Sequence, residues 1–300
     1  MKMAVERNTR ATPGFEARVE HALTLLRAAA AAHPGRIVLT TSLGAEDMVV
    51  TDLIARHRLP IALATLDTGK LHAQTLALIP RIEAHYGLKV ERWAPAAEQV
   101  LHLVQRHGEL PMRQGIELRK ACCALRKLEP LARLLAGRSA WVTGLRREQS
   151  GARGAVPFSA SDDQGRAKLN PLADWSWADV WHYIALHAVP YNPLHDEHFP
   201  SIGCAPCTRA IAAGEDFRAG RWWWESEDAK ECGLHLKPHS AAASAADGLL
   251  SGASSVFASE QAHVGAADVK DASTSGRSQN ESAKESGLHV TATHNTGVSA

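Results

Sequence analysis

The sequence predicts an α/β protein built on an open, mostly parallel β-sheet with crossover helices. Short apolar and β-branched runs alternate with longer segments whose apolar residues recur at helical spacing. Such alternation is typical of parallel sheets whose strands are joined by helices. With 300 residues, the chain is also long enough to bury a sizeable core.

The alternation is clearest in the first half of the chain. Over residues 15–33 the apolar positions recur at three- and four-residue steps, as an amphipathic helix requires. Further helices are expected at 45–57 and 71–86, and helical patterns continue to about residue 135. Strands are predicted at 36–41 (RIVLTT), 61–66 (IALATL), 88–93 and 140–144 (AWVTG).

Composition divides the chain into four parts. Residues 1–19 are expected to form an N-terminal arm, 20–221 the α/β domain, and 222–239 a mobile segment. Residues 240–300 are rich in Ser, Ala, Gly, Thr and Asn and contain no Trp, Tyr, Cys or Met. Such a segment buries too little apolar surface to offset its ordering entropy, so it is predicted to be a disordered tail.

The tail contains a near copy of an earlier segment. Residues 229–236 read AKECGLHL and residues 283–290 read AKESGLHV, with Ser286 in place of the cysteine. We interpret the second segment as a remnant without activity, because a serine hydroxyl has a far higher pKa than a thiol.

Charge and hydropathy exclude several classes of protein. The formal net charge is +1, which gives no reason to expect a nucleic-acid partner. No stretch approaches the ~20 apolar residues of a membrane span, so no membrane partner is expected. The opening residues, MKMAVERNTRATPG, lack the apolar region of a signal peptide. The sequence therefore predicts a cytoplasmic protein.

The sequence contains five cysteines, of which four resemble a set of metal ligands and the fifth stands apart. In a reducing compartment they indicate metal ligands plus a reactive thiol. Adjacent cysteines on a regular helix diverge by about 100°, which suits the separate irons of a [4Fe–4S] cluster better than one zinc ion. The expected ligands are Cys122, Cys123, Cys204 and Cys207. Zinc and two unrelated buried pairs remain alternatives from spacing alone.

Basic residues accompany the paired cysteines. Lys127 follows Cys123 by four residues, so on a helix both share one face. The ammonium of Lys127 can offset the negative charge of a thiolate-bound cluster. Arg119 and Arg126 are expected on a solvated face of the same helix.

Three predicted strands end in turns suited to an anion. Ser42 and Gly44 follow the first strand, Asp67 follows the second, and Gly144 ends the strand at 140–144. In open α/β sheets, ligands bind beyond the carboxyl ends of the strands. Backbone N–H groups and the helix dipole favour a phosphate at such a turn.

Arginines are expected to complete this anion site, since a guanidinium can grip phosphate or sulfate with two hydrogen bonds. Each arginine alone is typical of a protein surface, so the grouping makes the prediction. The candidates are Arg147 and Arg153 after the strand at 140–144, and Arg218 and Arg221 in the run FRAGR.

Cys232 stands apart in the run ECGLH. The neighbouring glycine gives the backbone freedom, and His235 can support a thiolate there. From the residues alone, a nucleophile and an idle cysteine are equally good interpretations.

Together these segments resemble the assimilatory adenylyl-sulfate (APS) reductases of the sulfonucleotide reductase family. The resemblance covers roughly residues 20–239 and rests on SLGAED, LDTG, CC-x₃-K, GLRREQS, SIGCAPCTR and ECGLH. It implies an adenine nucleotide alpha hydrolase-like, or ATP-pyrophosphatase-like, fold and a [4Fe–4S] cluster on the four cysteines. It also implies a substrate site that includes Leu66 of the LDTG run.

The resemblance further implies a mechanism. The Cys232 thiolate attacks the sulfate sulfur of APS, displaces AMP and forms a cysteine S-sulfonate, with Lys127 and His235 assisting. Thioredoxin, or glutaredoxin, then releases sulfite. One departure is that family members commonly end shortly after ECGLH, whereas this chain continues for about 65 residues.

Three alternatives remain at the level of sequence. Reduction of the 3′-phosphorylated nucleotide PAPS, or of both nucleotides, is the nearest, although the PAPS branch generally lacks the paired cysteines. A cluster-bearing tRNA thiolase would use an SGGxDS-type turn, whereas Ser42–Asp47 reads SLGAED. A zinc-stabilised binding module without catalysis is the third.

Overall fold

The computed structural model describes residues 2–226, and its centre is a six-stranded sheet. The strands are β1 (Ile37–Thr41), β2 (Ala62–Leu66), β3 (Val90–Trp93), β4 (Ala140–Val142), β5 (Ser159–Ser161) and β6 (Ala167–Leu169). Their order is β3-β2-β1-β4-β6-β5, and only β5 pairs antiparallel. The predicted open, mostly parallel sheet is therefore confirmed.

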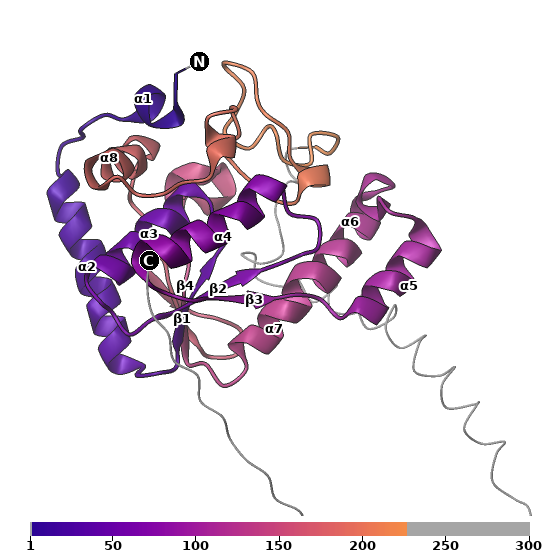
Figure 1. Cartoon of the computed structure of the whole chain (residues 1–300), viewed down its shortest axis with the longest axis horizontal. Helices are drawn as coiled ribbons and strands as arrows, with labels where there is room; N and C mark the ends of the chain where they lie inside the picture. The colour runs from indigo at the N-terminus through magenta and orange to yellow at the C-terminus, as the bar shows by residue number, and fades with distance from the viewer. Residues whose placement is uncertain (1, 227–300) are drawn as a thin grey trace, which may run out of the picture. The chain divides into compact units, whose positions relative to one another are not determined.

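Eight α-helices connect and flank these strands within residues 2–226 (Figure 1). They are α1 (Ala4–Asn8), α2 (Phe15–Ala32), α3 (Ala45–Arg56), α4 (Ala73–Tyr86), α5 (Ala97–His107), α6 (Ile116–Cys123), α7 (Glu129–Leu135) and α8 (Trp177–His187). The elements expected up to residue 144 are present within one or two residues of the predicted bounds. The short, largely exposed strand β5 and its partner β6 escaped prediction, because three residues show no period.

The sheet separates two apolar layers. Side chains on successive strand residues point to opposite faces, so Leu39 packs with α3, α4 and α8, whereas Val38 packs against α7. Figure 1 shows α3 and α4 in front of the strands. Both faces of the central strands are covered, which explains why β1 and β2 are apolar along their length.

The strand order reverses between β1 and β4. The chain passes from β1 to β2 and β3 on one side, and β4 then pairs with β1 on the other side. Loops that leave two strands at such a reversal point separate and leave room for a ligand. Here those loops contain Ser42 and Gly144.

The N-terminal residues pack on the domain. Ala4 is fully buried, its backbone N–H donates to the Asp196 carboxylate (2.6 Å), and Arg7 donates to the carbonyl of His195 (2.7 Å). The expected mobile segment is described only to residue 226. The expected tail at 240–300 and its near copy of ECGLH lie outside the described residues. Within 2–226, no helix combines the length and the apolar character that crossing a membrane requires.

Candidate active site and cysteine centre

The turn between β1 and α3 is closed by one carboxylate. Asp47 accepts hydrogen bonds from the backbone N–H and the hydroxyl of Ser42, each at 2.6 Å, and from the backbone N–H of Gly144 at 2.9 Å. Leu43 adopts a left-handed conformation (φ 62°), and Gly44 precedes the first turn of α3. Asp47 thus ties the end of β1 to the end of β4.

Gly144 lies too close to this carboxylate to carry a side chain. A Cβ there would stand 2.4 Å from Asp47 Oδ1 and 3.0 Å from the Asp47 backbone nitrogen. Burial raises the pKa of Asp47 to about 6, and the Ser42 hydrogen bonds oppose that rise. Asp47 is therefore ionised at neutral pH but close to its titration range.

A buried ion pair supports the same turn from the other side. Arg146 donates to Glu46 through Nε (3.1 Å) and Nη2 (2.9 Å), and Gln149 donates to the same oxygen at 2.9 Å. Burial opposes ionisation of Glu46, but Arg146 and Gln149 together hold its pKa below the ordinary value. This pair connects α3 to the loop after β4.

His195 caps α3 as a neutral ring. Its Nδ1 lies 2.7 Å from the carbonyl of Phe199, which can only accept, so Nδ1 carries the proton. Nε2 then accepts the backbone N–H of Ala45 at 3.2 Å. Burial lowers the pKa of His195 to about 4, which agrees with a neutral ring.

The predicted anion-binding arginines do not all lie together. Arg147 donates to the carbonyl of Val156 (2.9 Å) and lies over the ring of Phe158. Arg153 is buried and donates to the side chain of Gln149 (2.6 Å), which places it within the strand-end network. Arg218 is half-buried.

Arg221 belongs to a different neighbourhood. It is buried, packs against Gly203 and lowers the pKa of the Cys207 thiol through its charge. The loop after β2 lies between the two neighbourhoods. There Leu66 packs against the α7 face, while Asp67 pairs with Arg92 at 2.6 Å and accepts the backbone N–H of Gly69.

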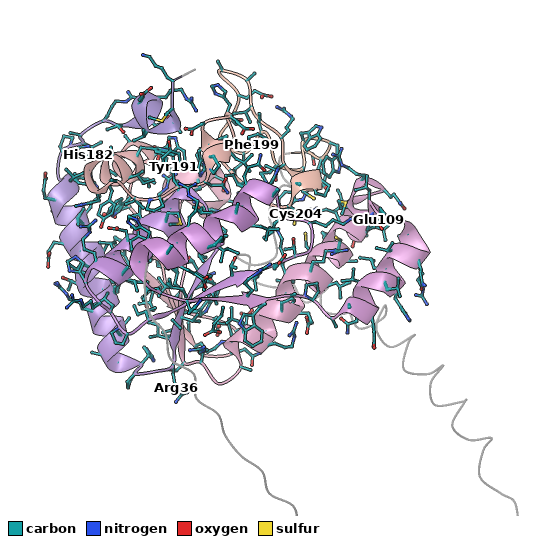
Figure 2. The ribbon with its side chains drawn as sticks, in the orientation of Figure 1. Arg36, Glu109, His182, Tyr191, Phe199 and Cys204 are labelled. Atoms are coloured by element: carbon teal, nitrogen blue, oxygen red, sulfur yellow. The ribbon has the colours of Figure 1, made fainter. Side chains whose placement is uncertain are left out.

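The four candidate ligands meet at one cavity. Cys122, Cys204 and Cys207 are buried and Cys123 is half-buried. Figure 2 labels Cys204 far from Arg36, the residue that precedes β1, so the cysteines lie toward the carboxyl ends of the strands. The other residues that line the cavity are Lys70, Met112, Arg126, Lys127 and Trp222.

Local backbone structure brings the two cysteine pairs together. Helix α6 ends at Cys123, and a π-helical turn, Ala124–Leu128, follows it directly. Such turns are rare and occur frequently at functional sites. Lys127 still faces the cavity beside Cys123, because a wider turn keeps residues four and five apart on one side. The regular helix assumed from the sequence is thus replaced here by a local irregularity.

The second pair is held by the loop after β2. Cys204 forms a β-bridge with Leu71, and the Thr68 hydroxyl lies 3.2 Å from Cys204 Sγ. The backbone N–H of Ala205 donates to the carbonyl of Lys70 at 2.7 Å. The LDTG run therefore joins the strand ends to the cysteines.

Positively charged side chains oppose the effect of burial on the pKa of the cysteine thiols. Burial raises the pKa of Cys122 and raises that of Cys207 to about 11, while Arg126, Lys127 and Arg221 act in the opposite direction. Arg126 also donates to the carbonyl of Thr68 at 2.7 Å. The expectation that Arg119 and Arg126 are solvated was wrong: both are buried, because each has a specific partner.

The donor set suits a cluster better than a single ion. Among the described residues, no group of three or more His, Cys, Asp or Glu is arranged to hold one metal ion. One zinc requires every sulfur within about 2.3 Å of a single point, whereas a cubane offers a separate iron to each thiolate. Four cysteines around one cation-flanked cavity can therefore hold a [4Fe–4S] cluster.

Several residues of the site were missed in the sequence. Asp47 and Thr68 stand inside SLGAED and LDTG, but their roles depend on contacts with Gly144 and Cys204, which are distant in sequence. Trp222 and Arg126 both line the cavity, although Arg126 was expected on a solvated helix face. Cys232 and His235 lie outside the described residues.

Comparison with known proteins identifies the class. The family model described as phosphoadenosine phosphosulfate reductase domain matches residues 36–210, and the chain belongs to this family. The match spans β1 to the SIGCAPCTR run, and hence the strand-end turns and the four cysteines of the site.

Within the family, the curated relatives point to one activity. A protein named adenosine 5′-phosphosulfate reductase from Allochromatium vinosum is 58% identical over 202 residues, which cover 67% of this chain and 79% of that protein. A protein of the same name from Burkholderia cepacia is 48% identical over 235 residues, covering 78% and 94%.

A solved structure supports the fold. The phosphate complex of phosphoadenylyl-sulfate (PAPS) reductase from Candida auris matches with a TM-score of 0.54 and 26% identity, over 68% of this chain and 98% of that one.

Proposed function

We propose that this protein reduces APS to sulfite and AMP in sulfate assimilation and cysteine biosynthesis, with a [4Fe–4S] cluster as cofactor. The observation that carries the proposal is the meeting of two distant cysteine pairs at one cavity, next to the strand-end turns. The relatives named adenosine 5′-phosphosulfate reductase supply the substrate. The cytoplasmic location predicted from the sequence belongs to the same proposal.

The nucleotide would lie across the carboxyl ends of the strands. Ser42 and Gly144 lie at the ends of β1 and β4, where Asp47 joins them. Gly44 begins α3, and the Leu66–Asp67 turn ends β2. A phosphosulfate directed from there toward the cysteines would meet cations. Lys127 and Arg221 flank the cavity, and Arg153, Arg147 and Arg218 would serve the phosphate side.

The reaction needs a thiolate and a reductant. The Cys232 thiolate attacks the sulfate sulfur, the bond from sulfur to the phosphate oxygen breaks, and AMP leaves with the electron pair. His235 would support the thiolate. A thiolate of thioredoxin or glutaredoxin then attacks Cys232 Sγ of the S-sulfonate and releases sulfite. The mixed disulfide that remains is resolved by the reductant's second thiol.

The cluster would be held by Cys122, Cys123, Cys204 and Cys207. It supplies a compact charge that polarises the surrounding site. The chain's own residues do the rest: Lys127 and Arg126 offset the thiolates, and the Thr68 hydroxyl orients Cys204. Lys127 is also suited to orient the sulfate, because its ammonium faces the cavity.

PAPS reduction, alone or beside APS reduction, is the second candidate. The family model and the solved Candida auris protein both carry the name of the 3′-phosphorylated nucleotide. Turnover measured on APS and on PAPS at equal concentration decides between them. A clear preference for PAPS would overturn the APS assignment.

One experiment tests reaction and nucleophile together. The purified holoenzyme is mixed with APS in the absence of reductant and digested, and the peptide that contains Cys232 is weighed. A gain of about 80 Da, one SO₃ group, is expected on that peptide. In the Cys232→Ser variant the adduct should disappear while nucleotide binding and absorbance near 400 nm persist. An unmodified Cys232 peptide in an active preparation would sink the proposed mechanism.

A further inference from the structure

A buried ion pair lies at the end of the described chain. Arg119 on α6 donates to Glu225 through Nε (3.0 Å to Oε1) and Nη2 (2.9 Å to Oε2). The two side chains are only 2% and 3% exposed. This is the two-pronged geometry in which a guanidinium holds a carboxylate most firmly.

The pair is attached to both halves of the cysteine centre. Trp222 packs between Arg119 and Arg221, each 4.6 Å from its ring, and its backbone N–H donates to the carbonyl of Cys207 (3.2 Å). The backbone N–H of Glu225 donates to the carbonyl of Trp222 at 2.8 Å. Glu225 is therefore fixed to the helix that carries one cysteine pair and to the loop that carries the other.

Stability alone is a weak reason for such a pair. Removing two charges from water costs about as much as their attraction returns, and apolar pairs of similar volume often do as well. A buried ion pair does fix one geometry, since any other arrangement leaves a charge unpaired. Neither Arg119 nor Glu225 lines the cysteine cavity, so direct contact with the cluster or the sulfate does not explain them.

We propose that Arg119 and Glu225 are positioning residues that fix the root of the segment carrying Cys232. This inference rests on the proposed function, in which Cys232 is the nucleophile. Cys232 follows Glu225 by seven residues, and an extended chain of that length spans at most about 25 Å. A fixed root limits the reach of the thiol to that distance from Glu225 and so raises its effective concentration at the sulfate.

The test distinguishes an effect on the position of the Cys232 thiol from an effect on its reactivity. In Glu225→Gln holoenzyme, single-turnover formation of the Cys232 S-sulfonate should slow at least about tenfold, because glutamine is uncharged and can accept from only one of the two guanidinium donors. Iron content, absorbance near 400 nm and AMP affinity should stay within about twofold of wild type. The rate of Cys232 alkylation by iodoacetamide without nucleotide should also be unchanged, since it reports the thiol itself.

Two further variants complete the design. Arg119→Lys keeps the charge but cannot form the two-pronged pair, so its rate should fall between those of wild type and Glu225→Gln. Glu117→Gln removes an exposed partner of Lys120 on the same helix and should leave the rate unchanged.

Two results would overturn the inference. One is adduct formation at the wild-type rate in Glu225→Gln. The other is a slow rate accompanied by a proportional loss of iron, which would make the pair a structural support of the cluster. A wild-type holoenzyme that forms no adduct at Cys232 would instead overturn the proposed function itself, and the positioning role with it.

Discussion

The turns at the strand ends lie next to the cysteine centre, but different interactions stabilise the two regions. At the strand ends, Asp47 accepts three hydrogen bonds, and Gly144 leaves no space for a side chain. At the cysteine centre, four thiols line one cavity together with Arg126 and Lys127, and the Thr68 hydroxyl lies 3.2 Å from Cys204 Sγ.

The difference teaches which region depends on a cofactor. The chain's own donors and acceptors satisfy each other at the strand ends, so this region can fold without a cofactor. Thiolates crowded at Cys204 and Cys207 repel one another, and burial raises the pKa of the latter. The thiolate form of the cysteine centre is therefore stable only next to positive charges, which basic side chains or bound iron ions can provide. We expect changes in one region to leave the other intact.

The largest effect is expected for Cys204→Ser. The hydroxyl of serine is a poor ligand for iron, so absorbance near 400 nm and bound iron should be lost, and sulfite release should fall by at least about 10³-fold. AMP affinity, measured by calorimetry, should remain within about threefold of wild type because the strand ends are self-contained. Ser201→Ala, a nearby control in the same loop, should retain its iron. Loss of AMP binding in Cys204→Ser would contradict the independence of the two regions.

Asp47→Asn tests the other region. The carboxamide can accept at one atom only, so the N–H of either Ser42 or Gly144 loses its acceptor. An unsatisfied buried donor costs about 1–3 kcal/mol, so the free energy of unfolding should fall by that amount, and the loosened turn should bind APS more weakly. Iron content should be unchanged. The control Asp163→Asn, at an exposed carboxylate, should bind APS normally.

The pH dependence of APS binding is a finer test of the hydrogen bonds that Asp47 accepts from Ser42 and Gly144. Burial raises the pKa of Asp47 to about 6 from 3.8, so the group takes up a proton near pH 6. At pH 5 about one molecule in ten retains the carboxylate, and APS affinity of the Cys232→Ser variant should fall about tenfold from its value at pH 7.5. Two neighbouring groups do not titrate in this range: the pKa of Glu46 is lowered from its ordinary value, and His195, with a pKa of about 4, stays neutral.

The free energy of unfolding should change in the opposite direction to the APS affinity. Since the folded-state pKa lies above that of the unfolded chain, proton uptake by Asp47 stabilises the folded protein as pH falls from about 6 toward 4. Lost affinity in this window therefore does not arise from unfolding at Asp47. The affinity of Asp47→Asn should be flat across it; a parallel decline in that variant would assign the titration to another group.

The sequence predicted the regular parts of the fold and the grouping of four cysteines at one place. Strands such as Ile37–Thr41 and helices such as Phe15–Ala32 have a period that a short window reveals. The four cysteines were recognisable because thiolates at this spacing have few other uses. The π-helical turn Ala124–Leu128 was not predictable, since no period in the sequence distinguishes it from the helices on either side.

The burial of arginine was also beyond the sequence. Arg119 and Arg126 have the spacing of a solvated helix face, yet their partners Glu225 and the Thr68 carbonyl come from distant segments. Arg147 shows the converse. Its place in the loop predicted an anion-binding role, which stays a prediction, but no local pattern predicted that its guanidinium would contact the ring of Phe158 and the carbonyl of Val156.

The smallest effect is expected for Thr68→Val, at the junction of the two regions. Valine keeps the shape of threonine but removes the hydrogen bond to Cys204 Sγ and the acceptor of the Lys70 N–H. One such bond contributes about 1 kcal/mol, so the cluster should assemble but bleach several-fold faster in air. Thr40→Val, which removes a hydroxyl bond to Val142 within the sheet, should bleach at the wild-type rate. Equal bleaching in both variants would show that the LDTG loop holds the strand ends and the cysteine centre together through its backbone alone.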